Sequence, residues 1–343
     1  MKLCQVGCGE HARTVHGPSQ ARLCRERPGL VLAACCDKDA GRAESYRTSF
    51  GFANAYSDLT AMLGAERPDA VVLVVPVETT VALASAILAR SIPLLLEKPP
   101  GSTVEEVDRL LAAAAGGRSG PPVPHQVAFN RRFVPLVQAL RHRLEGGPIQ
   151  HVHYELTRVD RRDPDFSTTA IHGIDVVRYL AGADYAHARF LYREMPELGS
   201  GVANTFVDAT MTSGATAHLA FCPVAGVVVE RAVVHARGHS FYLHVPMWGG
   251  ADSPGRLQHF EGGRLVEDLD GATVGDGTAL FELGGFYRET AAFLDALEAG
   301  RAPSPGLRDT RQSVEVAAHI RARRECWATA EGGEPVAPAP RTS

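Results

Sequence analysis

The sequence predicts an α/β protein in which a doubly wound parallel sheet is followed by an α+β region with a large, open, mostly antiparallel sheet. Three observations lead to this fold class. Apolar strand-like runs alternate with helical segments over residues 1–129, which is the pattern of βαβ units. From about residue 149, strand-like segments follow one another almost without interruption, as they do in antiparallel sheets. Two helical segments then precede an end that is rich in Gly and Pro.

The first region contains five apolar strand-like runs, at residues 3–6, 30–36, 70–75, 93–96 and 123–129. Because the runs are apolar at successive positions, we expect strands that are buried on both faces of a parallel sheet. The intervening helices are expected at residues 11–27, 40–49, 59–63, 79–90 and 103–115. Their alternation with the strands predicts the crossovers of a parallel sheet.

The second region begins with a predicted helix at residues 132–144, which ends at Gly146-Gly147-Pro148. The strands that follow are expected at 150–159, 186–192, 202–211, 215–221, 227–236 and 240–245. Turn signals such as Ser213-Gly214 separate them, and one helix interrupts them at 168–180. Terminal helices are expected at 281–298 and 309–328.

Composition excludes several classes of protein. The 343 residues carry a net charge of −4 and only 7% aromatic residues, which argues against nucleic-acid binding. No apolar run reaches about 18 residues and the first residues do not resemble a signal peptide, so we expect a cytoplasmic protein without a membrane partner. The seven cysteines lack the spacing of a zinc site and are expected to be reduced core residues.

A glycine-rich turn follows the first strand. The segment from Gly7 through Gly9 to Ala12 fits G-x-G-x-x-A and opens a helix, which is the context of a dinucleotide-binding Rossmann motif. The first glycine permits the tight turn, and the second lets the backbone approach a pyrophosphate at the helix N-terminus. Asp37 ends the second strand, where its carboxylate would bind the ribose and favour NAD. Lys38 and Arg42 are placed to bind a phosphate, so NADP stays open.

The segment Glu97-Lys98-Pro99 ends an apolar strand at the edge where open α/β sheets bind ligands. Together with the glycine-rich turn, it resembles the Gfo/Idh/MocA oxidoreductase family. Three further segments carry the resemblance, at residues 129–133, 171–180 and 285–309. The resemblance implies a Rossmann domain at 1–129 and an α+β substrate and oligomerisation domain at 130–330 whose C-terminal helices pack back on the first. The resemblance also implies a homo-dimer or homo-tetramer through the open sheet. The Gly- and Pro-rich composition of residues 331–343 predicts a disordered tail.

By the same resemblance, Lys98 would contact the substrate oxygen beside the nicotinamide and His172 would be the acid/base group. A neutral imidazole can accept a proton near physiological pH, and an ammonium stabilises negative charge on oxygen. The expected cofactor contacts are Gly7, Gly9, Glu10, His11, Ala12, Asp37, Lys38, Val75, Pro76, Glu97 and Lys98.

Two positions differ from the family pattern. The family commonly has an aspartate four residues before the histidine, where this chain has Thr168. Either His172 works with Lys98 alone, or Asp163, Asp165 or Asp175 substitutes. Asp175, three residues beyond the histidine, is better explained as orienting its helix. The loop that begins at Pro76 has Thr80 where relatives often have a histidine, so contacts near the nicotinamide differ.

Charged residues before the histidine helix allow two interpretations. Arg158, Arg161 and Arg162 either form a solvated loop or recognise an anionic substrate such as a sugar acid or nucleotide sugar. We include Arg158, Arg161, Thr168 and Asp175 as candidate substrate contacts. His151 and His153 alternate along a strand, but two ligands without a third do not predict a metal site, and no metal is expected.

The motifs together predict an NAD(P)-dependent dehydrogenase or reductase acting on the hydroxyl or keto group of a sugar, polyol or related compound. Two alternatives retain the cofactor. One is an enzyme that oxidises a sugar transiently to assist elimination or glycosidic cleavage and then reduces it again. The other is a non-catalytic regulator that binds the dinucleotide as a ligand. Steady accumulation of NADH with a simple sugar favours the dehydrogenase, and product formation without net change in NADH absorbance favours the second function. Bound cofactor without activity in a broad substrate screen favours the regulator.

Overall fold

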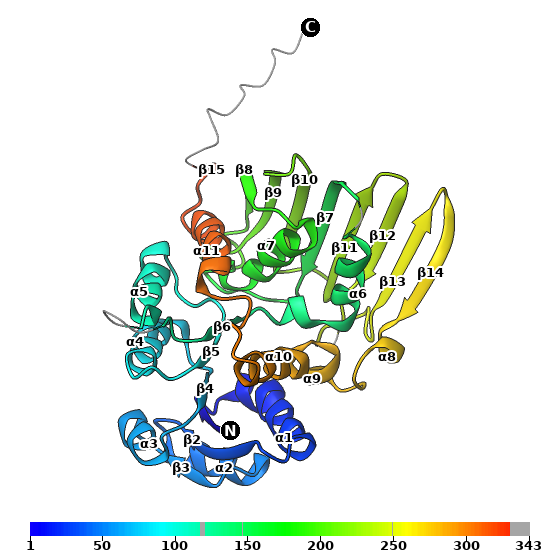
Figure 1. Cartoon of the computed structure of the whole chain (residues 1–343). Helices are drawn as coiled ribbons and strands as arrows, with labels where there is room; N and C mark the ends of the chain where they lie inside the picture. The colour runs from blue at the N-terminus through cyan, green and yellow to red at the C-terminus, as the bar shows by residue number, and fades with distance from the viewer. Residues whose placement is uncertain (117–120, 146, 249, 330–343) are drawn as a thin grey trace, which may run out of the picture.

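The computed structural model describes residues 1–116, 121–145, 147–248 and 250–329. Two sheets organise the chain (Figure 1), a six-stranded parallel sheet and a nine-stranded, mostly antiparallel sheet. This architecture confirms the predicted fold class. The expected tail at 331–343 lies outside the described residues.

The parallel sheet has the order β3-β2-β1-β4-β5-β6. Its strands are β1 (Lys2–Val6), β2 (Val31–Cys36), β3 (Asn54–Tyr56), β4 (Ala70–Leu73), β5 (Leu94–Glu97) and β6 (His125–Ala128). The helical segments between them are a π-helical turn η1 (Ala12–His16), α1 (Gly17–Glu26), α2 (Ala40–Phe50), α3 (Leu59–Glu66), α4 (Val77–Leu88) and α5 (Val104–Ala114). The order reverses beside β1, so the loop after β1 lies at a topological switch point, where such sheets bind ligands.

The larger sheet has the order β14-β13-β12-β11-β7-β10-β9-β8-β15. Its strands are β7 (Ile149–Thr157), β8 (Tyr185–Glu194), β9 (Ala203–Met211), β10 (Thr216–Cys222), β11 (Val229–Ala236), β12 (His239–His244), β13 (Arg256–Glu261), β14 (Arg264–Asp270) and β15 (Cys326–Ala328). β7 and β10 pair in parallel, while the other neighbours are antiparallel. Helices α6 (Pro135–Arg143) and α7 (Ser167–Ala181) lie on one face of this sheet (Figure 1).

Sequence patterning missed four strands, and one of them, β15, lies within a segment expected to be helical. β3 is a three-residue strand at the edge of its sheet and is not buried. The outermost strand β14 is mostly exposed and carries four charged residues among seven, so no apolar run marks it. β13 likewise lacks a regular buried face. Charged, solvated edge strands are common because they discourage pairing with other chains.

Three predicted helices also have different limits. The segment expected at 132–144 is a 3₁₀ turn η2 (Asn130–Phe133) followed by α6, which begins at Pro135 because proline suits the first turn of a helix. The segment at 281–298 is divided into α9 (Leu280–Leu283) and α10 (Phe286–Glu298) by Gly285, whose φ is 84°. The last expected helix, at 309–328, is α11 (Leu307–Arg321), and the chain then enters β15. A four-residue helix α8 (Gly271–Val274) follows β14.

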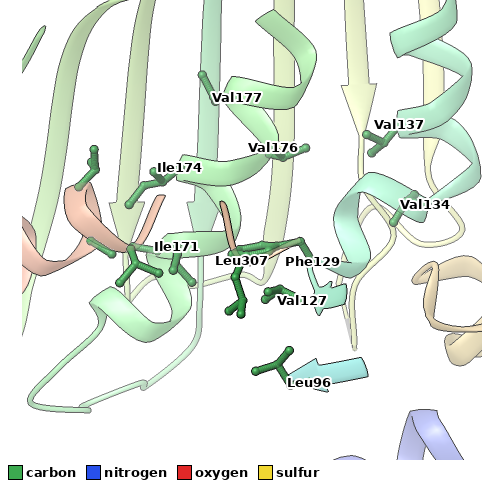
Figure 2. Packing of buried hydrophobic residues seen from close by; sticks show 14 of the residues in the cluster. Leu96, Val127, Phe129, Val134, Val137, Ile171, Ile174, Val176, Val177 and Leu307 are labelled. Carbon is green, nitrogen blue, oxygen red and sulfur yellow. The ribbon is translucent and has the colours of Figure 1, made fainter. Parts of the chain in front are cut away.

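One buried apolar cluster joins the two sheets (Figure 2). Leu96 of β5 and Val127 of β6 belong to the same cluster as Ile171 and Ile174 of α7. Leu307, at the start of α11, packs among them. This packing fixes the carboxyl end of β5 next to the beginning of α7.

The C-terminal helices contact the parallel-sheet region. The Tyr287 hydroxyl of α10 donates a hydrogen bond to Glu26 of α1 at 2.5 Å, and Arg311 of α11 pairs with Asp108 of α5 at 2.8 Å. α10 also packs against η1. Helix α10 therefore packs on η1, the turn that follows the glycine-rich loop, and α11 packs on α5.

None of the helices described by the structure is both long and apolar enough to cross a membrane.

Candidate active site

A cavity of about 700 Å³ is lined by loops of both sheets. Its walls come from the turn after β1, the loop after β4, the end of β5, η2, the end of β7 and the start of α7. The predicted site residues that line it are Gly9, Glu10, His11, Ala12, Val75, Pro76, Glu97, Lys98, Arg158, Arg161, Thr168 and His172. Gly7, Asp37, Lys38 and Asp175 do not line it.

The two glycines of the turn after β1 meet different requirements. Gly7 has a φ of 85°, and a Cβ there would lie 1.9 Å from the carbonyl oxygen of Val74. A Cβ at Gly9 would have no atom within 4 Å. Gly7 is thus required by the fold, whereas Gly9 keeps open the space through which a ligand would approach the backbone.

Asp37 holds the same turn in place. One carboxylate oxygen accepts a hydrogen bond from the backbone N–H of Cys8 at 2.8 Å, and the other accepts from the N–H of Asp39 at 3.0 Å. A carboxylate has about four lone-pair sites, so acceptor capacity remains for ribose hydroxyls. The open space at Gly9, the helical turn behind it and this carboxylate fit a dinucleotide.

Lys98 brings an ammonium group from the end of β5 into the cavity. Its side-chain nitrogen donates to the carbonyl oxygen of Thr168 at 3.2 Å. Burial, reinforced by repulsion from Arg131, Arg158 and Arg161, lowers the pKa of Lys98 to about 8, and Glu97 opposes the shift. The ammonium is therefore much more acidic than that of an exposed lysine.

His172 lies on α7, lines the same cavity and is buried. Burial and the nearby charges of Arg131 and Lys98 hold the pKa of its imidazole well below the usual range, so the ring is neutral at physiological pH. Its Nε2 lies 3.4 Å from Nη1 of Arg131. Its Nδ1 is buried and has no hydrogen-bond partner among the described residues.

A buried ion network lies behind these two residues. Glu230 of β11 accepts from Arg131 at 3.0 and 2.9 Å and from Arg158 at 3.1 Å, and it also accepts from the Tyr154 hydroxyl. Although burial alone would raise it, the charge of Arg131 brings the pKa of Glu230 down to about 2. The network fixes the guanidinium that lies beside His172.

Sequence reasoning assigned no role to Arg131 or Glu230. Arg131 lies in a segment that the family resemblance uses, but no pattern indicated its partner. Glu230 had one available signal, since it shares the buried register of β11 with Ala232 and Val234. An acid in that register needs a buried cation.

Glu97 joins two histidines under the glycine-rich turn. One of its oxygens lies 3.0 Å from Nε2 of His11 and 2.8 Å from Nε2 of His16. Burial opposes the shift, but His11 and His16 hold the pKa of Glu97 well below the usual range. The three donor atoms lie within 4.8 Å of one another, a grouping that would accommodate a metal ion and that the sequence did not predict.

The acids considered as substitutes at the Thr168 position have other partners. Both oxygens of Asp175 accept from Arg132 at 2.7 Å, and one also accepts from Ser313. Asp165 accepts from the backbone N–H of Ser167 at 3.0 Å. Asp163 pairs with Arg161 at 2.7 Å. Asp175 thus anchors α7 to η2 and α11 and lies away from the cavity.

Residues 2–118 match a family model described as "Oxidoreductase family, NAD-binding Rossmann fold" (GFO_IDH_MocA). Inositol 2-dehydrogenase 2 of Saccharopolyspora erythraea is 31% identical over 201 residues, which cover 55% of this chain and 56% of that protein. The chain thus spans about half the length of this curated relative.

Two solved structures share the fold over nearly the whole chain. UDP-N-acetylglucosamine 3-dehydrogenase of Acidithiobacillus ferrooxidans has a TM-score of 0.78 at 22% identity and covers 94% of this chain and 97% of its own. An oxidoreductase of Agrobacterium radiobacter in complex with NAD⁺, L-tartaric acid and magnesium has a TM-score of 0.76 at 17% identity. The match covers 96% of this chain and 98% of that one.

Proposed function

We infer that this chain, which belongs to the Gfo/Idh/MocA family of oxidoreductases, transfers hydride between a nicotinamide dinucleotide and a carbon bearing the hydroxyl or keto group of a sugar or polyol. The observation that carries this proposal is the joint placement of Lys98 and His172 in the cavity that the glycine-rich turn also lines. One residue is a partly buried cation and the other a buried neutral base. Alcohol oxidation needs both kinds of group.

The cofactor would supply the hydride acceptor in oxidation and the hydride donor in reduction. Gly7, Gly9 and the N-terminus of η1 would bind its pyrophosphate, and Asp37 would bind the adenosine ribose. Val75 and Pro76, which follow β4, line the same cavity as this turn and Lys98. We propose residues 1–129 as the dinucleotide-binding domain and 130–330 as the substrate domain.

The chain's own residues would control the proton and the charge on oxygen. Lys98 donates a hydrogen bond to the substrate oxygen and stabilises the negative charge that develops there. His172 accepts the hydroxyl proton in oxidation and returns it in reduction. Burial keeps the His172 ring neutral, and the adjacent guanidinium of Arg131 reinforces this because a second cation beside it is unfavourable. The aromatic rings of Trp248 and Phe286 line the cavity next to the ring of His11 and form an apolar part of its wall.

We propose NAD rather than NADP as the preferred cofactor, because the carboxylate of Asp37 would repel a 2′-phosphate. Titration of the protein with NADH and NADPH, followed by nicotinamide fluorescence, tests both the site and its preference. Asp37→Ser should weaken NADH binding about tenfold and reduce the difference in affinity between NADH and NADPH. Asp39→Asn, which changes a helix cap next to the site, is the matched control. Binding of neither dinucleotide would overturn the proposed function.

We also propose that copies of the chain associate through the face of the large sheet opposite α7, as a homo-dimer or homo-tetramer. Residues of that face include Tyr242, of which 40% is exposed, and Phe260, which packs against Tyr242 edge to face. Light scattering of the purified protein measures the oligomeric state, and a monomer at working concentration would contradict this expectation.

A further inference from the structure

Four cationic side chains line the cavity: Lys98, Arg131, Arg158 and Arg161. Three come from the substrate side, where Arg131 lies on η2 and Arg158 and Arg161 follow β7. The repulsion that these three arginines exert on Lys98 helps to lower its pKa. The ammonium group that would contact the substrate therefore lies in a region of positive electrostatic potential.

The carboxylates near these cations are fewer than the cations themselves. Glu230 accepts from Arg131, Arg158 and Tyr154, so a single negative charge serves two guanidiniums. Glu97 is bonded to His11 and His16. Within the described ranges no carboxylate oxygen lies within 4.0 Å of the Lys98 ammonium, and its recorded partner is the carbonyl oxygen of Thr168.

The guanidinium of Arg161 has one edge available. Its Nε donates to Asp163 at 2.7 Å, and neither terminal nitrogen has a recorded partner in the part of the chain that the structure describes. Its side chain is 47% exposed although the residue lines the cavity. Two terminal N–H groups in one plane are the geometry that binds an oxyanion through two parallel hydrogen bonds.

We propose that the substrate is an anionic sugar whose oxyanion is bound by Arg161, with Arg158 beside it, while the reacting hydroxyl lies at Lys98 and His172. The inference rests on the proposed function and adds a substrate class to it. The shared chemistry is that of an oxyanion, which a sugar supplies as a carboxylate or as a phosphate. A neutral polyol would leave the Lys98 ammonium and the terminal nitrogens of Arg161 without an anion among the described residues.

The test uses the full-length protein saturated with NADH, titrated by calorimetry with D-gluconate, D-glucose 6-phosphate and neutral D-glucose. At least one anion should bind about tenfold more tightly than D-glucose, and the tighter anion identifies the source of the oxyanion. Arg161→Gln should weaken that binding about tenfold while leaving NADH affinity unchanged.

Arg162→Gln is the matched control, because Arg162 is the adjacent exposed arginine, pairs with Asp160 at 2.5 Å and does not line the cavity. It should bind the anion like the unsubstituted protein. Equal binding of D-glucose and both anions, or an Arg161→Gln variant that binds the anions normally, would overturn the inference. Loss of NADH binding would instead overturn the proposed function, so the two failures are distinguishable.

Discussion

The side-chain nitrogen of Lys98 donates a hydrogen bond to the backbone carbonyl oxygen of Thr168 at 3.2 Å. The contact joins the end of β5 to the first turn of α7, 70 residues apart in sequence. It positions the ammonium one helical turn from His172 without neutralising its charge. A cation and a neutral imidazole therefore line the same cavity.

Lys98→Met and His172→Asn should each reduce kcat by about 10² to 10⁴ and leave dinucleotide binding in place. The reason is that each variant removes a group that acts on the substrate oxygen but keeps the glycine-rich turn. Single-turnover kinetics and NADH titration on the same samples separate the two effects. The control is His153→Asn on β7, which lies outside the cavity. Normal turnover in both site variants would rule out the mechanism.

The activity should fall as pH rises through about 8, because the pKa of Lys98 is lowered to about 8 by burial and by Arg131, Arg158 and Arg161. Above that pH the amine is neutral and stabilises an oxyanion poorly. No loss is expected near pH 6.5, since the pKa of His172 lies well below that value and its ring stays neutral. A profile of kcat/KM against pH checks both the expected loss above about pH 8 and the expected constancy near pH 6.5. A Lys98→Arg variant should lack the upper limb, and its persistence would assign the titration to another group.

Gly9→Ala should leave the melting temperature nearly unchanged and weaken NADH binding at least tenfold, because the new methyl enters the open space above the turn. Gly7→Ala should lower the free energy of unfolding by at least about 2 kcal/mol, since its Cβ would collide with the Val74 carbonyl at a φ of 85°. Calorimetric melting and NADH titration of both variants make the comparison. Unchanged NADH affinity in Gly9→Ala would mean that no ligand approaches this backbone.

Glu230→Gln should reduce the free energy of unfolding at pH 7 by about 3 kcal/mol, because it leaves buried cations without an anion. The pKa of Glu230 falls from an ordinary 4.5 to about 2 on folding, so its stabilisation is fully present above pH 4.5 and is lost as pH falls towards 2. Denaturant unfolding across that range should show the difference between variant and parent shrinking. Glu155→Gln, on the neighbouring strand β7 and in the alternate register, should have little effect. A difference that does not change with pH would contradict the role assigned to Glu230.

The sequence predicted those features that depend on local pattern. Fully apolar runs identified β2, β4 and β5, since strands buried on both faces need no other signal. The spacing of Gly7 and Gly9 between a strand and a helix marked the turn, and Lys98 was evident from the end of its strand. The charged edge strand β14 was missed because its side chains are largely solvated, and β13 beside it was missed because it has no apolar run.

The sequence by itself therefore determined the fold class and identified several of the side chains that line the cavity. The tertiary structure alone decided how those side chains are charged and paired. Arg131 and Glu230 are 99 residues apart, and no local periodicity relates a turn after β6 to a strand in the other sheet. The pKa of His172 and the anion that Lys98 lacks likewise depend on which groups the packing of α7 brings near them, because burial and Coulomb interactions act through space and not along the chain.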